Sequence, residues 1–136
     1  MSCKFLSSFS ADFPYQKKFL PLAKKILKAE SKDKSVNVIL CSDEEQRVLN
    51  RDFRKLDKVT DVLSFEWHEP NFLGEIYIAR DQVKRQAPQY DNTYFCELKR
   101  VLIHGLLHLC GYDHHTKQER KIMREKENYY YLLAYE

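Results

Sequence analysis

The segment HGLLHLCGYDH, residues 104–114, sets three histidines around the end of one helix. Apolar residues recur at helical spacing up to and within this segment, which predicts a helix over Thr93–Cys110. These residues are Phe95, Leu98, Leu102, Leu106 and Leu109. The first two histidines are four positions apart, so their rings leave the same face of the helix about one turn apart. We expect Gly111 to end the helix and to turn the third histidine back toward the other two.

The pattern His-x-x-x-His-x-x-Gly-x-x-His has the ligand spacing of the metzincin zinc proteases. It predicts His104, His108 and His114 as the ligands of one Zn²⁺ ion per chain. Three neutral imidazoles with an open fourth position are typical of a catalytic zinc site. In the proteases a glutamate follows the first histidine and acts as general base, whereas this chain has Gly105 there. We expect Gly105 to leave room beside the metal, where a phosphate could approach.

Three neighbouring residues leave alternatives open at this site. His115 could replace His114 as the third ligand, although the spacing favours His114. A cysteine such as Cys110 is more often a small buried hydrophobic residue than a thiolate ligand. Asp113 could orient a ligand histidine by hydrogen bonding to it from outside the ligand set, or it could cap the turn.

The rest of the chain alternates helical and strand patterns. Two further helices are predicted over residues 15–29, with a regular part beginning near Pro21, and over residues 81–88. A third begins at a Ser42–Glu45 capping box and continues through Val48, Leu49 and Phe53. A fourth begins at a Thr116–Glu119 capping box and continues to Leu133. Strands are predicted over residues 35–40, 60–67 and 72–79, with a further candidate within 3–9. Gly74 indicates a bulge or a close backbone approach. The sequence therefore predicts a single α+β domain over residues 1–136, in which helices cover a mixed sheet of about four strands and the metal-binding helix ends at a glycine turn.

Composition and charge are those of a globular protein. Of 136 residues, 43% are hydrophobic and 32% are charged, enough for a core and a soluble surface. The net charge of +3 permits a nucleic-acid partner without requiring one. The four cysteines show no regular spacing, so we expect reduced thiols. The chain has no apolar run near the roughly 20 residues that span a bilayer and no convincing signal peptide, so we expect a cytoplasmic protein without a membrane partner.

Three segments together resemble the signatures of the YbeY family of metal-dependent endoribonucleases. They are HGLLHLCGYDH, LNRDFRKLDKVTDVLSF (49–65) and LGEIYIA (73–79). The resemblance implies His104, His108 and His114 as zinc ligands and Arg54 as a residue of RNA processing. Two positions depart from the family pattern, because Glu66 stands where proline is usual and Glu75 stands where aspartate is usual.

The same resemblance implies a biological role. It implies cleavage of single-stranded RNA in 16S ribosomal RNA 3′-end maturation and in ribosome quality control. The expected partners are 16S ribosomal RNA and the small ribosomal subunit, and a ribosome-associated GTPase or a ribosomal protein is a further candidate. Two rival functions are a metallopeptidase, weakened by the missing base at Gly105, and a non-catalytic ribosome-assembly factor with a structural zinc.

A mechanism follows as a hypothesis. Zinc-bound hydroxide would attack the phosphate, and Arg54 would hold the phosphate and stabilise the charge that develops there. The ribose 2′-hydroxyl could be the nucleophile instead. The general base stays open among four carboxylates, which are Asp61, Glu66, Glu75 and Asp113.

Overall fold

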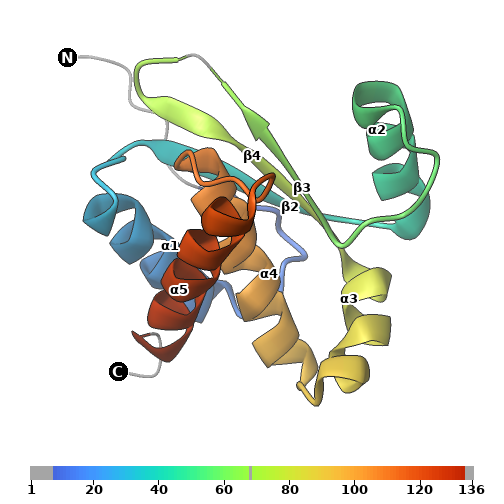
Figure 1. Ribbon diagram of the computed structural model, residues 1–136. Helices are drawn as coiled ribbons and strands as arrows, with labels where there is room; N and C mark the ends of the chain where they lie inside the picture. The colour runs from blue at the N-terminus through green and yellow to red at the C-terminus, as the bar shows by residue number, and fades with distance from the viewer. Residues whose placement is uncertain (1–7, 68, 134–136) are drawn as a thin grey trace.

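Four strands form a mixed sheet in the order β1-β2-β4-β3 (Figure 1). The computed structural model describes residues 8–67 and 69–133. The strands β1 (Ser8–Phe9), β2 (Ser35–Cys41) and β4 (Phe72–Ala79) run parallel, whereas β3 (Val62–Glu66) is antiparallel to β4 and forms an edge. The predicted α+β fold with a mixed four-stranded sheet is confirmed. Of the candidate first strand, Ser8–Phe9 forms β1, and residues 3–7 lie outside the described residues.

Helices cover both faces of this sheet (Figure 1). Helices α1 (Gln16–Ala29) and α4 (Tyr94–Leu109) pack on one face, α5 (Lys117–Leu133) packs over α4, and α2 (Asp43–Arg54) lies on the other face. The short helices α3 (Arg80–Gln86) and η1 (Ala87–Tyr90) lead from β4 to α4. In the part of the chain that the structure describes, no helix is long and apolar enough to cross a bilayer.

Helix α4 is the centre of the hydrophobic core. The sheet, α1 and α5 all contact it, so it is buried on almost every side. Its buried apolar residues therefore extend beyond the predicted stripe to Val101, Ile103 and Leu107. Because so much of its surface is buried, α4 is held in position by packing along most of its length.

The predicted helix-capping signals are confirmed. Ser42 Oγ accepts a hydrogen bond from the Glu45 N–H at 3.2 Å, and Glu45 Oε1 accepts one from the Ser42 N–H at 2.9 Å. Thr116 and Glu119 make the same reciprocal pair at the start of α5, at 3.0 and 2.9 Å. These pairs satisfy backbone donors that have no partner within the helix.

The helix predicted over residues 15–29 is confirmed, but the expectation that its regular part begins only near Pro21 is wrong. Helix α1 begins at Gln16, and Pro21 lies inside it. The side chain of Phe19, before the proline, is buried together with Leu22 and Ala23. Packing of this apolar face keeps the chain helical across the proline, which is exposed and interrupts the backbone hydrogen-bond ladder on the solvent side.

The side chains that α2 buries most fully are polar. Gln46 Nε2 donates to the Tyr77 carbonyl in β4 at 2.8 Å, and Asn50 Nδ2 donates to the Lys58 carbonyl at 2.9 Å. Phe53, one of the apolar residues of the predicted helix, is 66% exposed. Side-chain amides therefore attach α2 to the sheet and to the loop before β3.

Gly74 lies where two backbones approach closely, as predicted. A Cβ atom at this position would collide with the carbonyl oxygen of Phe65 in β3 and would lie 2.9 Å from Leu109 Cδ2. The pairing of β2 with β4 also shifts register between Ser35 and Val36, where Leu73, the residue before Gly74, is the extra residue of β4. The glycine therefore allows β3, β4 and the end of α4 to meet.

A nearly buried carboxylate joins α1, α5 and the loop after α4. Glu30, whose side chain is 9% exposed, accepts hydrogen bonds from Tyr112 Oη at 2.6 Å, from Lys126 Nζ at 3.3 Å, and from Tyr130 Oη. Burial alone would raise the pKa of Glu30, but these hydrogen bonds outweigh it and hold the pKa below its ordinary value of 4.5.

We expect Glu30→Gln to destabilise the fold by about 1–3 kcal/mol at neutral pH, because two tyrosines and a lysine lose a charged acceptor. Since folding lowers the pKa of Glu30, its contribution is present above pH 4.5 and is lost as the pH falls through the folded-state value. Urea unfolding of both proteins from neutral to acidic pH measures this. A stability gap that stays constant across this range would contradict the role of the charge.

Candidate metal centre

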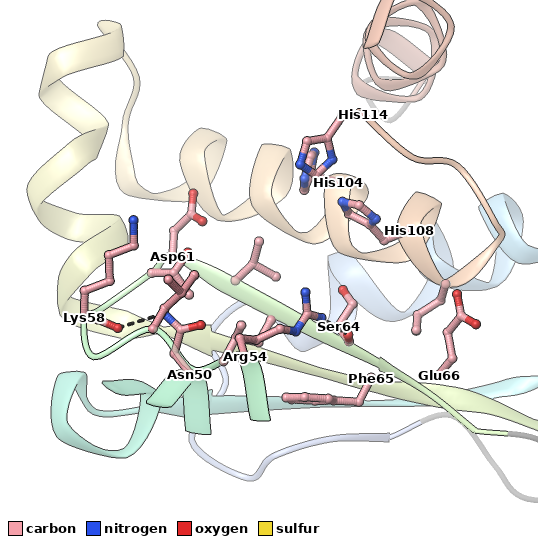
Figure 2. Close-up of a pocket in the computed structure, with 15 residues that line it drawn as sticks. Asn50, Arg54, Lys58, Asp61, Ser64, Phe65, Glu66, His104, His108 and His114 are labelled. Carbon is pink, nitrogen blue, oxygen red and sulfur yellow. Dashed lines mark hydrogen bonds between the residues drawn. The ribbon is translucent and has the colours of Figure 1, made fainter. Parts of the chain in front are cut away.

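The ligand nitrogens of His104, His108 and His114 all lie within 4.8 Å of one another (Figure 2). The ring centroids are 4.8 Å apart for His104 and His108, 5.0 Å for His108 and His114, and 6.0 Å for His104 and His114. The first two rings are half-buried on α4, and the third is exposed on the following loop. The sequence-predicted residues are thus brought together, and such a group can hold a metal ion.

A glycine turn returns the chain to the end of α4. Gly111 has a φ of 105°, which glycine adopts readily. Its N–H and that of Tyr112 each donate to carbonyls of the last turn of α4 at 3.0 Å, which satisfies the helix end. Arg120 of α5 donates to the His114 carbonyl at 3.3 Å. The loop is therefore hydrogen-bonded at both ends, which places the His114 ring beside α4.

The histidine in the middle of the group is neutral at physiological pH. Burial, together with the neighbouring imidazoles of His104 and His114, lowers the pKa of His108 to about 4. A metal binds the neutral form of imidazole. His108 therefore offers a lone pair without first having to release a proton.

Glu127 holds His104 and was not found by sequence reasoning. Its Oε1 lies 2.5 Å from His104 Nδ1, and the two side chains are only 20% and 30% exposed. Glu127 lies in α5 between the buried residues Met123 and Tyr130, four positions after the first and three before the second. A carboxylate on the buried stripe of the last predicted helix is the signal that could have identified it.

The structure shows where His115, the alternative third ligand, and Asp113 lie relative to His114. The His115 side chain is 78% exposed, and its Nε2 lies 3.1 Å from Asp113 Oδ2. Its ring stacks on that of His114 at 5.8 Å, but it does not belong to the group of ligand nitrogens. Asp113 Oδ1 accepts a hydrogen bond from the His114 N–H at 2.8 Å, so Asp113 caps the turn. The same oxygen lies 3.9 Å from His114 Nδ1, which is beyond hydrogen-bond distance. Orientation of a ligand ring by Asp113 stays a prediction.

The cysteines that the structure describes form no disulfide with one another. They are Cys41, Cys96 and Cys110, whereas Cys3 lies outside the described residues. Burial raises the pKa of Cys110 to about 11, so its sulfur is protonated at neutral pH. A protonated thiol favours the interpretation of Cys110 as a packing residue rather than a thiolate ligand.

The expectation that Gly105 leaves room beside the metal is wrong. A Cβ atom here would lie 2.9 Å from Ile76 Cγ2, 3.3 Å from Ser64 Oγ and 3.3 Å from Val62 Cγ2. The glycine therefore faces the sheet, and its lack of a side chain allows α4 to pack closely against β3 and β4. The space for a substrate lies elsewhere.

A pocket of about 620 Å³ opens beside the histidines (Figure 2). Its walls come from the end of α2, the loop that follows it, edge strand β3, and α4 with its loop. Ser64, Glu66 and Arg54 lie on the wall across from the rings. The pocket thus combines the histidines with residues about 50 positions earlier in the sequence.

Arg54 enters this pocket around the edge of the sheet. It is the last residue of α2, and its Nη2 donates to the Ser64 carbonyl in β3 at 2.8 Å. Its Cζ lies 5.6 Å from the centroid of the Phe65 ring. The Asn50–Lys58 hydrogen bond holds the loop that follows the helix (Figure 2). The structure therefore places the predicted phosphate-binding arginine on the same pocket as the histidines.

The four candidate bases fall into two groups. Asp61 and Glu66 line the pocket. Glu75 does not line it, and its carboxylate accepts hydrogen bonds from Trp67 Nε1 at 3.0 Å and Tyr77 Oη at 2.9 Å. Asp113 is also absent from the pocket lining and caps the turn, as described above. The geometry favours the first two residues for proton transfer.

A family model described as “Endoribonuclease YbeY” matches residues 7–133 of the chain. The chain belongs to the YbeY family. The resemblance found in its three motifs is thereby confirmed, and the chain is assigned to the RNA-cleaving hydrolases.

Individual members of the YbeY family support the same assignment. The Endoribonuclease YbeY of Thermotoga maritima is 45% identical over 106 residues, which cover 77% of this chain and 71% of the relative. The Endoribonuclease YbeY of Endomicrobium trichonymphae is 39% identical over 127 residues, covering 89% and 90% of the two chains. The solution structure of a Thermotoga maritima protein aligns with a TM-score of 0.69 at 37% identity, covering 96% of this chain and 89% of that one.

Replacing histidines one at a time tests the ligand set. We expect His114→Ala to weaken Zn²⁺ binding more than about 10–100-fold, because it removes a metal–nitrogen bond. A loss of about 10–100-fold is typical when only a group that orients a ligand is removed. His115→Ala should bind Zn²⁺ as the wild type does, since its ring lies outside the group. Isothermal titration of the metal-free proteins measures both affinities. The reverse ranking would assign the third ligand to His115.

Proposed function

We propose that this chain is a zinc-dependent endoribonuclease that cuts single-stranded RNA, with the whole of residues 1–136 acting as one domain. The observation that carries the proposal is the pocket that three histidines share with the Arg54 guanidinium. Following the resemblance stated above, we place its action in the cytoplasm, in 16S ribosomal RNA 3′-end maturation and ribosome quality control. Its partners would be the small ribosomal subunit and a GTPase or ribosomal protein associated with it.

Zinc fits the donor set of this site. Three imidazoles at mutual ligand distance, one of them kept neutral by burial, match the nitrogen ligands and the open position of catalytic zinc sites. The thiol of Cys110 is protonated and lies outside the group, so a closed site with a sulfur ligand is not favoured. When bound, zinc supplies a Lewis acid and lowers the pKa of a coordinated water.

Arg54 would bind the scissile phosphate. A guanidinium has five N–H donors, and one donor of Arg54 is used by the Ser64 carbonyl, which fixes the orientation of the planar group. Figure 2 shows the guanidinium on the pocket wall facing the histidines. The remaining donors can form a paired contact with phosphate oxygens and stabilise the charge that develops on them.

Asp61 or Glu66 would accept the proton from the attacking nucleophile. Gln86 Nε2 donates to Asp61 Oδ2 at 2.9 Å, which holds that carboxylate at the pocket wall, while Glu66 extends from the edge strand. The nucleophile is water or the ribose 2′-hydroxyl. The products distinguish the two, because attack by the 2′-hydroxyl leaves a 2′,3′-cyclic phosphate and attack by water does not.

Unpaired RNA suits this pocket better than a duplex. Single-stranded nucleotides can turn their phosphates and bases into a cleft, whereas an A-form duplex keeps them stacked and paired. The pocket is bounded on one side by β3 and on another by α4 and its loop, so the strand would have to enter between these walls. A metallopeptidase is not favoured, because Gly105 supplies no base and faces the sheet.

We expect Arg54→Ala to reduce cleavage of single-stranded ribosomal RNA about 10²–10³-fold, the usual loss when one group that stabilises transition-state charge is removed. Its zinc content should equal that of the wild type, because Arg54 is not among the ligands. Arg51→Ala is the matched control, since Arg51 belongs to the same helix, is exposed and does not line the pocket.

The assay compares single-stranded RNA, duplex RNA and casein, each with and without a chelator. His108→Ala, prepared in parallel, controls for contaminating ribonuclease. Cleavage by Arg54→Ala at the wild-type rate would reject its role, and chelator-sensitive cuts in casein would favour the peptidase. Zinc binding that stabilises the fold without any cleavage would favour the non-catalytic assembly factor.

A further inference from the structure

A short hydrogen bond connects the metal centre to the last helix. Glu127 Oε1 lies 2.5 Å from His104 Nδ1, and neither side chain is more than 30% exposed. For comparison, Asp113 Oδ1 lies 3.9 Å from His114 Nδ1 and is occupied by a backbone N–H. The motif that supplies the ligands does not include Glu127, which is 13 residues beyond its end.

The packing of α5 determines where this carboxylate lies. Met123, Glu127 and Tyr130 follow helical spacing on one stripe, and the first and last of them are buried. Tyr130 is also hydrogen-bonded to Glu30 at the end of α1, which fixes the rotation of α5 about its axis. Because α5 packs along α4, this stripe brings a carboxylate to His104.

The contact determines which ring nitrogen of His104 is available. A neutral imidazole that donates its Nδ1–H to a carboxylate keeps the lone pair of Nε2 free. Such a carboxylate also fixes the direction of the ring and makes the free nitrogen a stronger electron donor. The same contact thus sets the tautomer of His104, the direction of its ring and the donor strength of its Nε2.

We propose that Glu127 is a positioning residue, which holds His104 as the Nδ1–H tautomer and directs its Nε2 toward His108 and His114. The proposal rests on the metal-binding function given above to the three histidines. It adds a fourth residue from α5 to a site that the sequence motif confines to α4 and its loop. Metal affinity then depends on how α5 docks against α4.

Two variants and one control test this role. Glu127→Ala removes the acceptor, and we expect it to bind Zn²⁺ about 10–100-fold more weakly than the wild type. Glu127→Gln keeps an oxygen that can accept the Nδ1–H, so it should recover part of the affinity. Glu125→Ala removes an exposed carboxylate from the same helix and should bind Zn²⁺ with wild-type affinity.

The tautomer is a readout that does not depend on activity. In the metal-free wild type, long-range ¹H–¹⁵N correlation spectra of the imidazoles should show His104 with its proton on Nδ1. In Glu127→Ala the Nε2–H form, which free histidine favours, should dominate, while far-ultraviolet circular dichroism shows the same helix content.

The outcomes separate this proposal from the proposed function. Wild-type His104 with its proton on Nε2, or Glu127→Ala with wild-type zinc affinity, would overturn the positioning role and leave the metal site intact. If the wild type itself bound no Zn²⁺, the metal function would fail and the positioning role with it. If Glu127→Ala did not fold, the wild-type tautomer and the affinity of Glu127→Gln would still decide.

Discussion

Close packing of α4 against β3 and β4 at Gly105 is the contact on which the site depends. No side chain separates the helix from the sheet at this point, where Ile76, Val62 and Ser64 would meet a Cβ atom. Ser64 contributes to both sides of this contact, because its Oγ donates to the Gly105 carbonyl at 3.2 Å and its own carbonyl accepts from Arg54. The distance between the histidines and the arginine wall of the pocket is therefore set by how closely helix and sheet approach.

Two carboxylates fix the loop that carries His114 and the ring of His104, which the contact at Gly105 does not hold. Glu30 connects the end of α1 with Tyr112 in the glycine turn and with Tyr130 in α5. Glu127 connects α5 with His104. Both are largely withdrawn from water, which is favourable only because each is paired with hydrogen-bond donors. The loop that carries His114 and the ring of His104 thus depend on elements outside the motif.

Much of this arrangement follows from local rules in the sequence. The capping residues, the helix period and the glycine turn predict α4 and the convergence of its histidines, because each depends on neighbours within a few positions. Such rules do not predict the antiparallel edge strand, the exposure of Phe53 or the polar residues that α2 buries. These features depend on which faces meet in three dimensions, as do the roles of Glu127 and Gly105. Pro21 shows the same limit, since packing of Phe19 keeps the chain helical before the proline, although proline locally favours the first turn of a helix.

The proposed site requires the folded chain to present three imidazoles, and no thiolate, to one zinc ion. The zinc K-edge X-ray absorption spectrum of the zinc-loaded wild-type protein tests it most directly. The spectrum should show about three nitrogen scatterers with imidazole features at roughly 2.0–2.1 Å, completed by a light atom from solvent. A sulfur scatterer at about 2.3 Å, or a shell with fewer than three imidazoles, would contradict it.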